Sequence, residues 1–170
     1  MKILNIGCGN RKIKNAVNVD INPDFKPNII WDLNKKWTFS KTNEFDVVIA
    51  NHIIEHLDDY SFIFSEIHRV AKNNAKVFIR VPHFSSVQAY STFGHKHFFA
   101  SGVFRQIPGF KLIKIQLNYI ISNVNQPIWK RIISFLPSFL ANLNLYLCER
   151  FWCYLIGGFS EIYIELEVIK

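Results

Sequence analysis

The stretch Leu4–Asp20, LNIGCGNRKIKNAVNVD, sets the organisation of the N-terminal half of the chain. It joins two short apolar runs, 2–6 and 16–20, whose length and flanking turn residues predict β-strands. The glycine loop and residues 10–15 between them have space for only one or two helical turns, although a crossover between parallel strands usually takes at least about ten residues. We therefore predict a shortened first crossover.

Further along the chain, the apolar runs 28–32 (NIIWD) and 45–51 (FDVVIAN) predict a third and a fourth strand. The second of these runs is apolar almost throughout, as in strands that are buried on both faces of a parallel sheet. Apolar residues recur at helical spacing over 61–72, and a fifth strand is predicted over 76–81. This order indicates parallel strands that are joined by crossovers.

Two late runs, 110–119 (FKLIKIQLNY) and 160–169 (SEIYIELEVI), alternate apolar and polar residues. Alternation of this kind predicts an antiparallel pair at a sheet edge. Together with the parallel central strands, it predicts a doubly wound α/β sheet with helices on both faces. The chain shows no linker or repeat, and its 170 residues suit a single domain, 1–170.

Polar residues follow several of these strands at their carboxyl ends, which meet at one edge of a parallel sheet and form the usual ligand site of such folds. Gly7 and Gly9 would let a ligand approach the backbone. The Asp20 carboxylate would accept hydrogen bonds from the hydroxyls of a ribose, or it is simply an acid in a turn. Asp32 would either accept a hydrogen bond from an adenine amino group or cap a helix, while the Leu33 N–H would serve a ring nitrogen.

Taken in order, these motifs resemble those of the class I S-adenosylmethionine-dependent methyltransferases. LNIGCGN is similar to the cofactor loop of that family, NVDI to its ribose-binding segment and WDLN to its adenine-binding segment. FDVVIANHIIEHLDD and EIHRVAKNNAKVFIRVP are similar to its fourth strand, the following helix and the fifth strand. The likeness spans 3–82 and implies a seven-stranded sheet with an antiparallel last strand, with S-adenosyl-L-methionine as the cofactor.

The resemblance also assigns roles to individual residues. It implies that Asn51 lies near the sulfonium of the cofactor, and that Glu55 and His56 lie beside the methyl group or shape the loop there. The chain lacks the third glycine and the full first helix of the family, so Arg11 or Lys12 would line the pocket instead. The cofactor-binding residues expected on this basis are Gly7, Cys8, Gly9, Asp20, Ile21, Asp32, Leu33 and Asn51.

The methyl acceptor should bind beyond the fourth and fifth strands, where residues 82–104 carry three histidines among aromatic residues. His83, His95 and His97 are the candidate catalytic residues, because an imidazole titrates near neutral pH and serves as a general base with little tuning. The same side chains would suit a metal ion, but no fourth ligand stands out. We therefore expect acid–base or structural roles for them and no metal site.

Asn51 is followed by His52 and Ile53, and not by the Pro-Pro-aromatic sequence with which amino-directed DNA methyltransferases of this family continue. This difference argues against DNA as the substrate. RNA stays an alternative, since the formal charge of +7 favours anionic partners, although the basic residues are scattered. A non-catalytic module that keeps the fold is another alternative.

The segment 123–158, between the last two strands, is an apolar insertion rich in Trp, Phe, Leu and Ile. Pro127 and Pro137 predict helix starts, and the glycine pair 157–158 predicts a helix stop. Together they indicate two helices with a break near Pro137.

The longest uncharged run of the insertion, 132–148, falls short of the roughly twenty apolar residues of a membrane-spanning helix. A lid over the active site, a homodimer contact and a membrane-surface contact through 126–158 remain open. The protein is expected to be cytoplasmic, because its three cysteines lack CxxC spacing and its N-terminus enters a strand directly. If the insertion contacts a membrane surface, the protein would be peripheral to that membrane. The favoured function is methyl transfer to a small-molecule or lipid-linked acceptor held near the insertion.

Overall fold

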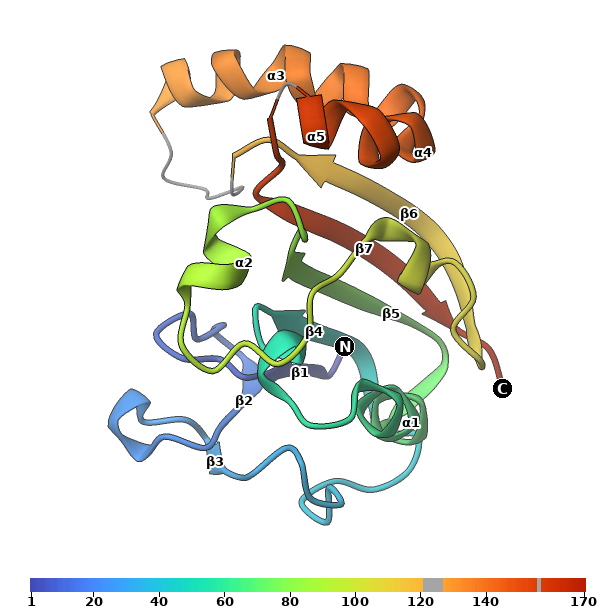
Figure 1. Cartoon of the computed structure of the whole chain (residues 1–170). Coiled ribbons are helices and arrows are strands. Elements are labelled where there is room, and N and C mark those ends of the chain that lie inside the picture. Colours follow the sequence, from blue (N-terminus) through green and yellow to red (C-terminus); the bar gives the residue numbers. More distant parts are fainter. Residues whose placement is uncertain (121–126, 156) are drawn as a thin grey trace.

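The computed structural model describes residues 1–120, 127–155 and 157–170 (Figure 1). Its centre is a seven-stranded sheet with the order β3-β2-β1-β4-β5-β7-β6. β7 is antiparallel to both of its neighbours, and the remaining pairs are parallel, which confirms the predicted sheet. The strands are β1 (Ile3–Ile6), β2 (Ala16–Asp20), β3 (Ile29–Ile30), β4 (Phe45–Asn51), β5 (Ala71–Pro82), β6 (Phe110–Asn118) and β7 (Glu161–Val168).

Helices are few outside the insertion. The α-helices in the described part of the chain are α1 (Tyr60–Val70), α2 (Val87–Ser91), α3 (Ile128–Leu143), α4 (Leu145–Leu147) and α5 (Cys153–Leu155). A π-helical turn, Cys148–Trp152, joins α4 to α5. Short 3-10 turns occur at η1 (Pro23–Phe25), η2 (Ile54–His56) and η3 (Ser101–Phe104).

The core lies where α1 packs against the central strands. α1 begins after Asp59, whose carboxylate accepts the N–H groups of Ser61 and Phe62. Ile63, Ile67 and Val70 of α1 are fully buried. The inward side chains of β1, β4 and β5 are buried as well. Burial of their apolar surface stabilises the sheet.

The first crossover contains no helix at all, which corrects the expectation of one or two helical turns. Two buried asparagines at paired positions of β1 and β2 hold it instead. Asn5 Nδ2 donates to the Arg11 carbonyl (3.1 Å) and to Asn18 Oδ1 (2.9 Å). Asn18 Oδ1 also accepts the Ile13 N–H (2.9 Å). Because these amides satisfy loop backbone groups, the loop keeps its shape without helical hydrogen bonds.

Two elements are shorter than predicted. β3 pairs over only two residues, so Asp32 lies in the following turn and not at the strand end. α1 ends at Val70 instead of Lys72, because the carbonyls of Arg69 and Val70 accept N–H groups of residues 43–44. The chain therefore enters β5 directly from the helix.

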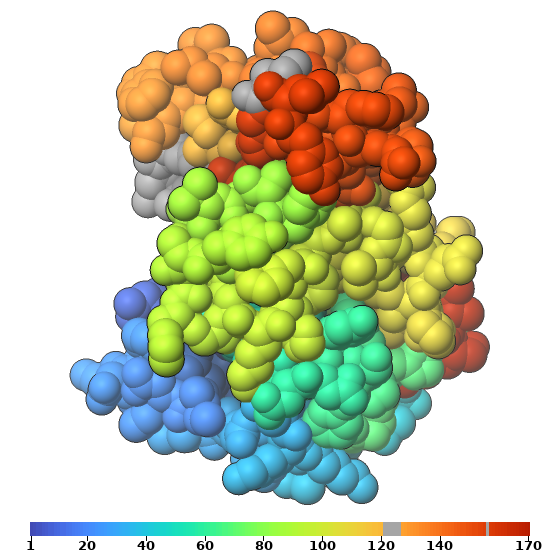
Figure 2. Space-filling model, in the orientation of Figure 1, coloured from blue at the N-terminus to red at the C-terminus, as the bar shows by residue number. Residues whose placement is uncertain are grey.

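The insertion forms a lobe at one end of the molecule, beside the edge strand β6 (Figures 1 and 2). α3 runs through Pro137, so the expected break near this proline is wrong. The break lies at Asn144, whose side chain accepts the Leu147 N–H (3.0 Å) and caps α4. The first expected residues of the insertion, 123–126, lie outside the described part.

The chain bends by 108° between the two arms of the insertion, Ile128–Leu143 and Leu145–Leu155. Within the described part of the chain, no single helix has the length and apolarity needed to cross a membrane; these two arms reach that measure only when they are taken together.

α3 is attached to β6 mainly by polar side chains. Asn142 accepts the Leu117 N–H (2.9 Å) and donates to the Leu117 carbonyl (2.8 Å), and Ser138 Oγ accepts the Tyr119 N–H (3.0 Å). These bonds satisfy the exposed backbone groups of an edge strand. Within α3, which the structure describes completely, Ala141 is the one buried residue. The apolar side chains of α3 therefore stay largely exposed.

Candidate functional site

The turn after β1 contains two glycines with different structural roles. Gly7 and Gly9 both have a left-handed backbone (φ +60° and +47°), which favours glycine. A Cβ at Gly7 would lie 2.3 Å from Ile53 Cγ1, so this glycine lets the turn after β4 pack directly on the loop. A Cβ at Gly9 would meet no atom within 4 Å, so the backbone there is open to a ligand.

The Asp20 carboxylate lies directly beside the glycine loop. Its Oδ2 accepts the Gly9 N–H (2.8 Å), and its Oδ1 accepts the Asn22 N–H (3.0 Å). Each carboxylate oxygen can accept a further bond, so Asp20 is oriented and still able to bind ribose hydroxyls. Ile21 next to it is 63% exposed and offers an apolar surface. Cys8 is buried below the loop, and burial raises the pKa of its thiol.

The turn after β3 carries the residues expected at the adenine. Asp32 Oδ1 accepts the Asn34 N–H (3.0 Å), so this carboxylate caps a turn, and its Oδ2 lies 3.8 Å from the ammonium of the exposed Lys35. Leu33 is buried, and its carbonyl accepts the indole N–H of Trp37 (3.1 Å). Trp31 Nε1 is one of three buried side-chain atoms in the described residues that have no hydrogen-bond partner. An unpaired buried donor is costly, which indicates a position that a ligand or a water satisfies.

The turn after β4 begins with His52, which also has a left-handed backbone (φ +52°). Its Nε2 lies 3.2 Å from Glu161 Oε2, and its Nδ1 lies 3.5 Å from Glu55 Oε1. Burial alone would lower the pKa of His52, but the carboxylates of Glu161 and Glu55 outweigh burial and raise the pKa to about 9. Arg80 also donates to Glu161 (2.8 Å), so a buried charged network ties the ends of β4, β5 and β7 together.

His83 follows β5 and is fully buried. Its Nδ1 lies 2.6 Å from Ser85 Oγ, and its Nε2 lies 3.2 Å from Glu149 Oε1. Glu149 belongs to the π-helical turn of the insertion and also accepts the Ser101 N–H (2.6 Å). Burial would raise the pKa of Glu149, but the bonds from His83 and Ser101 outweigh it and lower the pKa. His83 thus has both ring nitrogens engaged and connects the sheet to the insertion.

The loop 92–97 folds over the turn after β4. The N–H groups of Lys96 and His97 donate to the Glu55 carbonyl (2.7 and 3.2 Å). His97 Nε2 lies 2.9 Å from the Leu57 carbonyl. Main-chain and side-chain bonds therefore fix the loop against η2.

The three predicted catalytic histidines do not form one cluster. His95 lies edge-on against His56, with ring centroids 4.6 Å apart. In the described part of the chain, the side chains close enough to share a metal ion are Glu55, His56 and His95. His83 and His97 lie outside this group.

Two acids of the site were not among the residues predicted from the sequence. Glu149 is the one acid between Pro127 and Gly158, and a lone acid in an apolar insertion is a signal for a buried pair. Glu161, the first residue of β7, gives no comparable local signal, because its partners come from distant strands.

The residues at this edge fit S-adenosyl-L-methionine. The open backbone at Gly9, the oriented Asp20 and the exposed Ile21 lie at the carboxyl ends of β1 and β2, and Asn51 ends the neighbouring β4. A dinucleotide would need the N-terminus of a first-crossover helix for its phosphates, and the described crossover has none. The bound cofactor would supply an electrophilic methyl group on a sulfonium.

Comparisons with known proteins support the methyltransferase fold and S-adenosyl-L-methionine as the cofactor. The sequence matches the model of a methyltransferase domain over residues 4–79. No curated protein matches the chain in sequence.

Solved structures share the fold along nearly the whole chain. A SAM dependent methyltransferase from Archaeoglobus fulgidus is 20% identical with a TM-score of 0.66, over 98% of this chain and 85% of that one. An S-adenosylmethionine dependent methyltransferase from Mesorhizobium loti is 10% identical with a TM-score of 0.63, over 98% and 90%. The [4+2]-cyclase SpnF is 12% identical with a TM-score of 0.58, over 99% and 74%.

At these identities the structural likeness establishes the fold alone, and the family match covers residues 4–79, which include the glycine loop and the turn after β4. The match, the strand order and the geometry around Gly9 and Asp20 converge on one assignment. The chain contains a region similar to a methyltransferase domain and shares the fold of S-adenosylmethionine-dependent methyltransferases.

Proposed function

We propose that the protein transfers the methyl group of S-adenosyl-L-methionine to a lipid-linked acceptor, which it reaches at a membrane surface through its insertion. The observation that carries this proposal is the exposed apolar surface of α3, α4 and α5. A soluble small-molecule acceptor is the alternative outcome that the experiments below separate from it.

The insertion exposes large apolar side chains in both of its arms. In α3, the exposed fractions are 67% for Ile132, 69% for Phe135, 59% for Leu136 and 67% for Leu143; in α5, Leu155 is 80% exposed. Soluble monomers rarely expose a continuous apolar surface of this kind, and such surfaces mark contacts with other proteins or with membranes.

The charges of the insertion favour a membrane over a second protein copy. Trp129, Lys130 and Arg131 stand together in the first turn of α3, and aromatic and basic residues of this kind lie at the headgroup level of interfacial helices. The one acid of the segment, Glu149, is turned inward to His83. The surface is therefore apolar and basic, which suits anionic phospholipid.

The described residues of the insertion line several grooves, and two of these also border other parts of the chain. One of about 410 Å³ lies between α3 and β6, and its lining joins Lys114 and Arg131 to Phe139, which suits an anionic ligand with an apolar part. The other, of about 490 Å³, lies between the insertion and the segment after β5, where the rings of Phe84 and Tyr154 have centroids 6.1 Å apart. The second groove supports a path from the insertion toward the acceptor side of the sheet.

Flotation with phospholipid vesicles tests the membrane contact. The variant Ile132→Ser with Leu136→Ser removes two exposed apolar side chains, and we expect its affinity for phosphatidylglycerol vesicles to fall at least about 10-fold. The matched control, Ile113→Ser with Ile169→Ser, changes two exposed isoleucines outside the insertion and should float like the wild type. Equal flotation of the two variants would contradict the membrane contact.

Transfer of label from methyl-tritiated S-adenosylmethionine to a total lipid extract tests the acceptor. We expect radioactivity in the organic phase with the wild type and much less with the Ile132→Ser, Leu136→Ser variant. Calorimetry should show that this variant keeps its affinity for S-adenosylmethionine. Label that appears only in water-soluble compounds would exclude a lipid-linked acceptor.

RNA is a second candidate, because exposed aromatic rings lie near the cofactor edge. Tyr90 and Phe98 stack with ring centroids 4.5 Å apart, and Phe93 in the same loop is fully exposed. Such rings can stack on unpaired bases. A steep fall in the affinity for a single-stranded RNA with added salt would support this candidate, and a flat response would count against it.

A further inference from the structure

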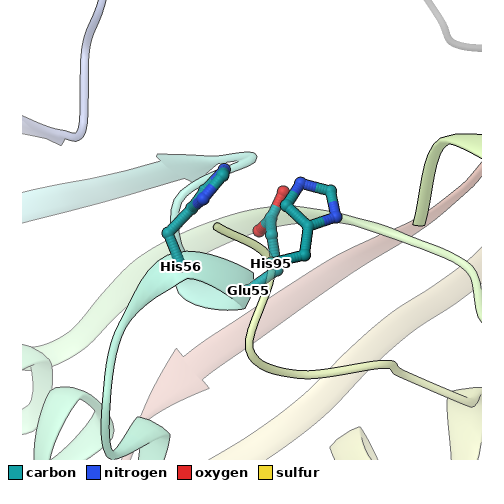
Figure 3. Close-up of side chains that lie close together, drawn as sticks. All are labelled: Glu55, His56 and His95. Carbon is teal, nitrogen blue, oxygen red and sulfur yellow. The ribbon is translucent and has the colours of Figure 1, made fainter. Parts of the chain in front are cut away.

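We propose that Glu55, His56 and His95 bind a divalent transition-metal ion of the zinc type beside the glycine loop (Figure 3). The proposal rests on the side chains of this cluster and is independent of the identity of the methyl acceptor. It also departs from the expectation drawn from the sequence, which grouped His95 with His83 and His97 and lacked a carboxylate ligand.

The Glu55 carboxylate is the first reason. Glu55 is fully buried, and neither of its oxygens has a hydrogen-bond partner in the described residues. His52 Nδ1 lies 3.5 Å from Oε1 as a long ion pair, and Oε2 has no partner of this kind among the described residues. Buried carboxylates are normally paired or bound to a metal, because an ionised group without a partner is costly in the interior.

The two histidines are oriented as metal ligands are. His56 Nδ1 lies 3.2 Å from the Gly94 carbonyl, and His95 Nδ1 lies 2.9 Å from the Ala89 carbonyl. A carbonyl only accepts, so in the neutral rings Nδ1 carries the proton and Nε2 keeps its lone pair. Donation of the second ring N–H to a carbonyl is the usual outer support of a metal-bound histidine.

The cluster has the size of a metal site. One ligand atom from each residue lies within 4.8 Å of the others, and Figure 3 shows the carboxylate between the two rings. Ligands at zinc distances lie about 3.4 Å apart, so small side-chain rotations would close the gap. Three protein ligands leave one position open, as in zinc sites that also bind water or a substrate oxygen.

The elements that carry the ligands are already held together. Glu55 and His56 belong to η2, and the loop that carries His95 donates the Lys96 N–H to the Glu55 carbonyl (2.7 Å). Ile53, next to η2, packs on Gly7 of the cofactor loop. A metal ion here would therefore lie at the same sheet edge as the cofactor.

Zinc titration of the full chain without a histidine tag, after treatment with a chelator, tests the site. We expect one zinc ion per chain by calorimetry, and an affinity at least about 10-fold weaker in each of the variants Glu55→Gln, His56→Gln and His95→Gln. The matched control is His68→Gln, which changes a histidine that bonds to the Ile169 carbonyl in another part of the molecule. It should bind zinc like the wild type.

Cobalt(II) provides a second measurement that does not depend on enzyme activity. The wild type should give visible absorption bands of a low-coordinate cobalt site, and His95→Gln should lose them, while urea denaturation shows that the variant is folded. Absence of zinc uptake, or uptake that His68→Gln reduces as much as the three cluster variants do, would overturn the proposal. Neither experiment needs the cofactor, the vesicles or the methyl acceptor, so its result is separate from that of the proposed function.

Discussion

α1 and α3 are both rich in apolar side chains, yet the sheet covers only the first of them. α1 buries Ile63 and Ile67 against the central strands. α3 buries Ala141 alone and is attached to β6 through the amide of Asn142 and the hydroxyl of Ser138. The same type of residue therefore stabilises the fold in one helix and faces outward in the other.

The two helices therefore place different demands on their apolar residues. In α1, removal of an apolar side chain leaves a cavity, so the identity of the residue determines stability. In α3, removal of an exposed side chain leaves no cavity in the core, so these residues contribute little to stability and are free to make the membrane contact proposed above. Stability and membrane contact should therefore respond to different substitutions.

The largest effect is expected for Ile67→Ala in α1. This side chain is fully buried, and the variant should lose about 2–5 kcal/mol of unfolding free energy in urea. Vesicle binding per folded molecule should stay unchanged. A loss below about 1 kcal/mol would show that α1 contributes to the core no more than α3 does.

Gly7→Ala should follow, with a loss of about 2–4 kcal/mol, because its Cβ would meet Ile53 Cγ1 at 2.3 Å in a left-handed backbone. Addition of Ile53→Ala to the Gly7→Ala variant should restore the part of the unfolding free energy that is lost through the contact with Ile53. Gly9→Ala, which meets no atom, should cost only the backbone strain of about 1–2 kcal/mol. Equal losses for both glycines in chemical denaturation would contradict this assignment.

Asn142→Ala should loosen α3 without unfolding the sheet, because it removes both bonds to the Leu117 backbone. We expect a loss of about 1–3 kcal/mol that is confined to the insertion. Hydrogen exchange should then speed up at the Leu117 amide and in α3, and not in β1 or β4. Ile133→Ala, in the same helix and 54% exposed, is the control that should leave exchange unchanged.

The unfolding free energy should also depend on pH through Glu44, which lies directly before β4. The Lys2 ammonium and the Ser40 hydroxyl lower the pKa of Glu44 to about 2 from its ordinary value of 4.5. A lowered pKa in the folded state gives stability that is complete above pH 4.5 and is lost as the pH falls toward 2. The stability difference between wild type and Glu44→Gln, about 1 kcal/mol at pH 7, should therefore shrink over this range. A difference that is constant from pH 7 to pH 3 would contradict it.

The smallest effect is expected for Leu136→Ala in α3. This side chain is 59% exposed, so the unfolding free energy should change by no more than about 0.5 kcal/mol. Urea denaturation beside Ile67→Ala gives the direct comparison of the two helices. A loss similar to that of Ile67→Ala would place α3 in the core.

Most of the sheet could be predicted from the sequence, because runs and alternation report burial on the faces of strands. The runs 16–20 and 45–51 are β2 and β4, and the two alternating runs are β6 and β7. The missing crossover helix was not predicted, since Asn5 and Asn18 replace helical bonds with side-chain bonds.

The break of the insertion was misplaced for a different reason. A proline removes one N–H from a helix, but it does not end the helix when the neighbouring turns hold. Asn144 does end α3, because its side chain also caps the next helix. Whether the helix ends at Pro137 or at Asn144 depends on this hydrogen bond of the Asn144 side chain. Local sequence patterns do not reveal it.

The sequence predicts that Gly9 and Asp20 meet at the strand ends, and the structure joins them by a hydrogen bond; their contact with the cofactor stays a prediction. The separation of the histidines was not predicted, because the loops that carry them determine the distances between their side chains. His83 and His95 are close in sequence, but the segment between them carries His95 to Glu55 and leaves His83 with Glu149.

α3 lies along the edge strand β6, and this position sets its distance from the glycine loop after β1. β1, which carries the glycine loop, lies four strand positions from β6. At about 4.8 Å per position, the loop lies roughly 19 Å from the edge that α3 covers. If α3 rests on a bilayer, methyl transfer takes place about two nanometres above it. The acceptor must then carry its reactive atom on a long headgroup or leave the bilayer before it reacts.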